Sequence, residues 1–180
     1  METNEQYDEV IANCRHIFMG KTKDYGTAWR VLRPISIADQ IFIKAQRIRT
    51  IQENKKQKVE DDVPTEFAGI INYAIIGNIQ LHLPNNAAEE MGSNMVSKWY
   101  DTQVTNAKKL MLDKNHDYGE AWRSMSQESF VDLILMKIQR IRQIITNEGK
   151  TVMSEGLAAN FYDILNYAIF ALIKINEKES

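Results

Sequence analysis

Two copies of one short string contain the residues best suited to bind a ligand. The string reads Lys-x-x-Asp-Tyr-Gly-x-Ala-Trp-Arg, and it begins at Lys21 and again at Lys114. Its aromatic side chains can cover a nucleobase, and its basic side chains can bind phosphate groups. An equally open alternative is a fixed turn that anchors a tryptophan in the core. The candidate binding residues are Lys21, Asp24, Tyr25, Trp29 and Arg30 in the first string, and Lys114, Asp117, Tyr118, Trp122 and Arg123 in the second.

A basic face is expected on the helix that follows each string. At 100° per residue, Lys44 and Arg47 lie on the polar side of the first of these helices, and Lys137 and Arg140 repeat them in the second. We expect these side chains to bind an anion, since the planar fork of a guanidinium matches phosphate. The alternatives are an ordinary solvated face or an ion-pair network between the copies.

Acidic and amide side chains recur on the last apolar segment of each copy. Glu66 and Asn72 lie on the first segment, and Asp163 and Asn166 lie on the second. A spacing of three residues places side chains on one helical face, and two carboxylates placed in this way can bind Mg²⁺. Asn72 and Asn166 are candidates for binding substrate. The alternative is that both amides only satisfy backbone groups or each other inside a core helix.

A magnesium site would need carboxylates from both copies, because each copy supplies only one acid at this place. The four candidate ligands are Glu66, Asp163, Asp39 and Asp132. Asp163 stands on an otherwise apolar helix, where an unpaired carboxylate is costly. A cation, Lys137 or Arg140 must therefore compensate its charge.

The strings belong to a longer internal duplication. Residues 21–52 align without a gap onto residues 114–145, and 16 of the 32 pairs are identical. The same offset pairs Tyr7 with Tyr100, and one extra residue in the second copy then pairs Phe67 with Phe161. Chance similarity between helical sequences does not produce such a match. The chain is therefore two copies of one unit.

The pattern of apolar residues predicts three helices in each copy and an all-α fold. We expect a pseudo-twofold six-helix bundle in which residues 1–81 form the first unit, 82–94 connect, and 95–180 form the second unit of one compact domain. The first helix is expected to end near Gly20, which leaves the string in a loop. Capping boxes at Ser36 and Ser129 are expected to start the second helices.

Composition excludes several classes of protein. The net charge is −2, so there is no strong signal for binding nucleic acid, and the most apolar stretches are too short and too polar to span a membrane. The acidic amino terminus does not resemble a secretory signal, and the single cysteine, Cys14, cannot form an intramolecular disulfide. We therefore expect a cytoplasmic protein.

The duplicated strings, the Lys-x-x-Arg helices and the Asp-Ile-Leu-Asn-Tyr-Ala segment resemble the first nucleotide-modification-associated domain family, a domain of unknown function. The resemblance covers most of both units. That family is similar, more distantly, to the all-α nucleoside triphosphate pyrophosphatases of the MazG-like group. Those enzymes hold Mg²⁺ through Glu-x-x-Glu and Glu-x-x-Asp pairs, so the resemblance implies a nucleotide and Mg²⁺.

Two functions stay open at this stage. The resemblance implies a Mg²⁺-dependent nucleotide-handling protein that cleaves a triphosphate between its α and β phosphates. However, the Glu-x-x-Asp pair falls on Glu66 and Gly69 in one copy and on Asn160 and Asp163 in the other, so each pair is half replaced. The alternative is a noncatalytic helical module that binds a partner, including a homodimer.

Overall fold

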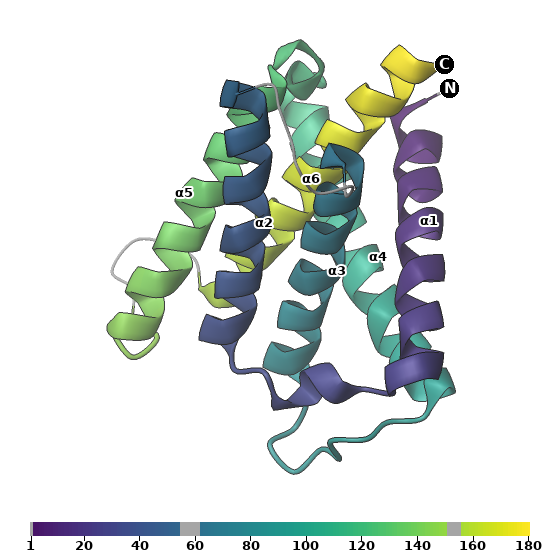
Figure 1. Ribbon diagram of the computed structural model, residues 1–180, viewed down its shortest axis with the longest axis vertical. Coiled ribbons are helices and arrows are strands. Elements are labelled where there is room, and N and C mark those ends of the chain that lie inside the picture. The colour runs from purple at the N-terminus through teal and green to yellow at the C-terminus, as the bar shows by residue number, and fades with distance from the viewer. Residues whose placement is uncertain (1, 55–61, 151–155) are drawn as a thin grey trace.

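The computed structural model describes residues 2–54, 62–150 and 156–180, and within these ranges it contains helices and no strand (Figure 1). The α-helices are α1 (Thr3–Tyr25), α2 (Pro34–Asn54), α3 (Val63–His82), α4 (Ser93–Tyr118), α5 (Gln127–Thr146) and α6 (Leu157–Glu179). Two short 3₁₀ helices, η1 (Ala28–Val31) and η2 (Ala121–Ser124), follow α1 and α4. The expected all-α bundle is confirmed.

The third helix of each copy lies at the centre of the bundle. α3 and α6 are apolar around most of their circumference, and they pack against each other and against the other helices. In Figure 1, α2 lies between α5 and α3, while α6 crosses behind them. The core is therefore shared by both copies.

Reciprocal ion pairs reveal the pseudo-twofold relation between the copies. Each ion pair joins a residue of one copy to a residue of the other. The two equivalent residues, which lie 93 positions away in the sequence, form a second ion pair in which the copies exchange roles. The four pairs are Arg142–Asp39 at 2.8 Å, Arg49–Asp132 at 3.9 Å, Arg15–Asp101 at 2.8 Å and Lys108–Asp8 at 2.6 Å. α2 with α5, and α1 with α4, therefore pair about the same approximate axis.

Two buried tyrosines make the corresponding contacts inside the core. The Tyr7 hydroxyl donates to Asn166 Oδ1 at 2.7 Å, and the Tyr100 hydroxyl donates to Asn72 Oδ1 at 2.8 Å. In both cases the tyrosine belongs to one copy and the asparagine to the other. Burial raises the pKa of both tyrosines well above the usual value, so their hydroxyls stay protonated and can donate.

Each asparagine also contacts the first helix of its own copy. Asn72 Nδ2 donates to the Cys14 carbonyl, and Asn166 Nδ2 donates to the Ala107 carbonyl, both at 3.1 Å. One amide therefore joins three helices from both copies. Because buried polar groups are costly without partners, these contacts fix how the two units pack.

Two expectations about helix boundaries are wrong. α1 continues past Gly20 as far as Tyr25, so the first residues of the string are helical. These turns lack apolar periodicity because they are mostly solvated. Gly26 caps the end of α1, and Gly119 caps the end of α4; their φ values of 62° and 60° are those that glycine tolerates best.

The second helices also begin earlier than the capping boxes suggest. α2 begins at Pro34, whose fixed φ suits the first turn of a helix. α5 begins at Gln127, because the Ser126 side chain accepts a hydrogen bond from the Ser129 backbone amide at 3.2 Å. Ser36 and Ser129 therefore lie inside the first turns. Among the described residues, no helix is long and apolar enough to cross a membrane.

We predict that Tyr7→Phe and Tyr100→Phe each lower the free energy of unfolding by about 1–3 kcal/mol, because each leaves an asparagine oxygen that is buried (Asn166) or partly buried (Asn72) without its donor. Urea denaturation followed by circular dichroism measures the change. Tyr118→Phe is the matched control, since the Tyr118 side chain is exposed. Equal stability of all three variants would contradict the assigned role of the buried hydroxyls.

Candidate functional site

A pocket of about 460 Å³ opens in the first copy, between the end of α1, η1, α2 and α3. The string supplies Lys21 and Tyr25 from α1 and Trp29 from η1. Lys44 comes from α2, and Tyr73 comes from α3. The fold thus brings together residues from both predicted groups, the string and the basic face.

Aromatic side chains form much of the pocket surface. Tyr25 is 72% exposed, and Trp29 is partly buried with its ring centroid 6.2 Å from that of Phe18. The Lys44 ammonium lies 5.9 Å from the centroid of the Tyr73 ring. Such surfaces favour flat, weakly polar ligand groups and cations.

The absence of a side chain at Gly69 determines the position of Lys44. A Cβ atom built at Gly69 would lie only 2.9 Å from Lys44 Cε and 3.2 Å from Lys44 Nζ. The lysine therefore lies directly over the α3 backbone, where the helix has no side chain of its own. Both residues line the pocket.

The charge balance of the pocket depends on Glu66. This carboxylate is 7% exposed, and it accepts from Arg47 Nη1 at 2.9 Å while Lys44 Nζ lies 3.8 Å away. Lys21 also lines the pocket, but no described carboxylate forms an ion pair with it. Lys21 therefore adds a positive charge that the pocket's own acid does not pair with.

The second copy places an acid where the first has glycine. Asp163 corresponds to Gly69 in the alignment. Its buried carboxylate lies 2.8 Å from Lys114 Nζ and 2.9 Å from Lys137 Nζ, and these lysines are the equivalents of Lys21 and Lys44. The expectation that a basic residue compensates Asp163 is confirmed for Lys137.

The tryptophans of the two strings also differ. Trp122 is buried and stacks on Phe170, with ring centroids 4.2 Å apart and an interplanar angle of 6°. The Arg123 guanidinium lies 4.4 Å from the centre of the Trp122 ring. The second string therefore anchors its tryptophan in the core, whereas Trp29 keeps a face in the pocket.

The two arginines of the strings hold other parts of the chain. Arg30 donates to the carbonyls of Ala87 and Ala88, at 3.1 and 3.2 Å, and so fixes the connector beside η1. Arg123 donates to Glu177 in α6 and Gln6 in α1, both at 2.7 Å. Neither arginine lines the pocket. These contacts account for the presence of an arginine in both strings, and no ligand is needed to explain it.

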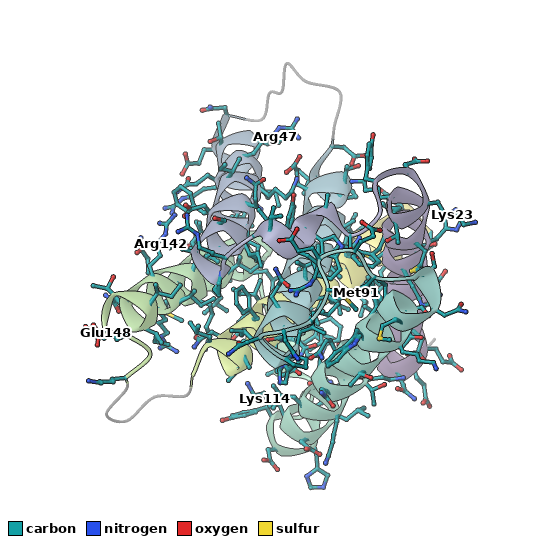
Figure 2. The ribbon with its side chains drawn as sticks, turned by 90° about the horizontal axis from the view of Figure 1, so that it is seen from below. Lys23, Arg47, Met91, Lys114, Arg142 and Glu148 are labelled. Atoms are coloured by element: carbon teal, nitrogen blue, oxygen red, sulfur yellow. The ribbon has the colours of Figure 1, made fainter. Side chains whose placement is uncertain are left out.

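The remaining predicted residues lie at several places. Asp24, Asp117, Tyr118 and Arg140 are exposed and lie outside the pocket. Asn72 lines the pocket, but its amide already binds Tyr100 and the α1 backbone, and Asn166 does the same in the second copy. Figure 2 shows Lys114 and Arg47 at separate ends of the molecule.

The four predicted metal ligands are all close to basic side chains. Besides Glu66 and Asp163, Asp39 lies 2.8 Å from Arg142, and Asp132 lies 3.9 Å from Arg49. No group of three or more His, Cys, Asp and Glu residues that could hold a metal occurs in the described ranges. A Mg²⁺ ion would therefore have to compete with lysine and arginine for each of these carboxylates. Magnesium binding stays a prediction.

Several residues of the pocket were not singled out from the sequence. Phe18 and Thr22 line the pocket from α1. An end of this helix near Gly20 does not predict that they lie beside the string. Gly69 was noted only as a lost acid. Tyr73 carried a usable signal, because the Asn-Tyr-Ala triplet recurs in both copies.

Fold and site together define an all-helical protein with two tandem units and an open pocket in the first. The chain belongs to the family described as Nucleotide modification associated domain 1, whose model matches residues 21–81 and again residues 114–175. Each matched segment runs from the end of a first helix through the third helix. No curated protein and no solved structure matches the chain.

We predict that Asp163→Asn lowers the free energy of unfolding by about 1–3 kcal/mol, because it leaves the largely buried Lys137 ammonium without its counterion. Half of the Lys114 side chain is exposed, which limits the cost on that side. Thermal and urea denaturation measure the loss. Asp132→Asn is the control, since its ion pair is exposed and should contribute under about 1 kcal/mol. If both variants were equally stable, Asp163 would not have the structural role described.

Proposed function

We propose that the chain binds a nucleoside phosphate in the pocket of its first copy. The observation that carries the proposal is the combination of aromatic side chains with Lys21 and Lys44 in one pocket of about 460 Å³. That volume lies within the usual range for small-molecule sites, about 300–1,000 Å³. The family description, which refers to nucleotide modification, supports the same class of ligand.

The two kinds of side chain suggest how the ligand lies. A base can stack on the aromatic faces of Tyr25, Trp29 or Tyr73, which tolerate any planar ring. The phosphates can then reach the ammonium groups of Lys21 and Lys44. Glu66 holds Arg47 and Lys44 near the pocket and limits its excess positive charge.

The proposal is for binding and includes no hydrolytic step. A pyrophosphatase of the kind suggested by the more distant resemblance needs carboxylates that are available to Mg²⁺, which would supply an activated water. In this chain Glu66 and Asp163 each contact two basic groups instead. Binding without turnover therefore agrees better with the ion pairs.

We predict that a panel of nucleoside mono-, di- and triphosphates contains ligands that raise the melting temperature by about 5–10 °C at 100 times their dissociation constant. Lys21→Ala and Lys44→Ala should each weaken binding by about tenfold or more, since each removes a charge-assisted contact. Isothermal titration calorimetry with and without Mg²⁺ measures the affinities.

Lys23→Ala is the matched control. Lys23 lies on the same helix as Lys21 and is exposed like it, but it does not line the pocket and points outward in Figure 2. Its substitution should leave affinity unchanged. If no nucleotide binds, or if Lys23→Ala weakens binding as much as Lys21→Ala, the proposal is wrong. Release of pyrophosphate in the presence of Mg²⁺ would show that the enzyme alternative applies.

A further inference from the structure

We propose that the space above Gly69 is an anion subsite for a phosphate group of the ligand, and that Asp163 fills the equivalent subsite of the second copy with the chain's own carboxylate. The proposal deepens the function proposed above and rests on it only for the nucleoside part of the ligand. It assigns the phosphate end of the pocket to one place on α3. In the first copy the subsite accepts an external anion, and in the second copy Asp163 occupies it.

The second copy provides the template for the subsite. There, one carboxylate oxygen of Asp163 contacts Lys114 at 2.8 Å and the other contacts Lys137 at 2.9 Å. Two ammonium groups that converge on one buried carboxylate also suit a phosphate, because both anions offer several oxygens to N–H donors. Asp163 thus behaves as a permanently bound anion.

The first copy keeps both cations and lacks the acid. Lys21 and Lys44 are the equivalents of Lys114 and Lys137, and both line the pocket together with Gly69. Lys44 lies over Gly69 and is 3.8 Å from Glu66, a longer separation than either ion pair of Asp163. No described carboxylate pairs with Lys21. An external anion at Gly69 would complete the arrangement seen in the second copy.

The acids of the two copies lie at different positions on the third helix. Glu66 lies one helical turn before Gly69, and it binds Arg47 and Lys44 from the edge of the pocket. Its equivalent in the second copy is Asn160, which donates to the Gly156 carbonyl at 2.9 Å instead. Glu66 therefore lies one turn before the subsite of the first copy, whereas Asp163 lies inside the subsite of the second.

The test compares two substitutions at one position. Gly69→Asp adds a carboxylate between the lysines, and Gly69→Asn adds the same volume without charge. Gly69 is helical, and the atoms that a new Cβ would approach belong to the flexible end of Lys44, so both variants should fold. Calorimetry with inorganic tripolyphosphate should show at least tenfold weaker binding for Gly69→Asp than for Gly69→Asn.

The reverse substitution tests the second copy. Asp163→Gly removes the internal carboxylate and gives this copy the glycine of the first. Tripolyphosphate should bind the wild-type chain at one site and the variant at two, and it should raise the melting temperature of the variant more than that of the wild type. A single site in a folded Asp163→Gly variant would overturn the proposal.

The outcomes separate this inference from the proposed function. If tripolyphosphate binds and Gly69→Asp prevents it, but no nucleotide binds, the subsite stands and the nucleotide function fails. If a nucleotide binds and Gly69→Asp leaves its affinity unchanged, the function stands and the subsite is wrong. Equal losses in Gly69→Asp and Gly69→Asn also overturn the subsite, because space alone would then explain them. Failure of tripolyphosphate to bind the wild type overturns it directly.

Discussion

The packing of this protein depends on two hydrogen bonds that buried tyrosines make between its halves. Tyr7 donates to Asn166, and Tyr100 donates to Asn72, while each asparagine amide also binds the first helix of its own copy. A shift of either unit would leave several buried polar groups without partners. The two copies are therefore held in one relative orientation, and the pocket between α1 and α3 keeps its shape.

The same scaffold carries different side chains around equivalent lysines in its two copies. The lysines of the string and of the following helix are present in both copies, but the groups around them differ. In the second copy Asp163 forms ion pairs with both lysines, and Trp122 stacks in the core. In the first, Gly69 and the partly buried Trp29 leave a pocket. One difference of charge and volume on the third helix, glycine at position 69 and aspartate at position 163, thus distinguishes the two sites.

The sequence was sufficient to predict the fold, because the duplication and the apolar periodicity act over many residues. The helix ends were less predictable, since the last turns of α1 are solvated and carry no apolar pattern. The lysines of the pocket could be predicted from their repetition. The tyrosine–asparagine contacts could not, because a linear pattern does not show which helix of the other copy each residue will meet. Similarly, the separation of the acids into ion pairs depends on tertiary packing.

The central claim is that the two equivalent strings have different roles, and that ligand binds in the pocket of the first. Nuclear magnetic resonance of the tryptophan indole N–H groups tests it directly, because Trp29 lines the pocket and Trp122 is buried against Phe170. During titration with nucleoside triphosphates, the account predicts a large, saturable shift of the Trp29 signal and little change at Trp122. Equal shifts at both tryptophans, or a shift confined to Trp122, would contradict it.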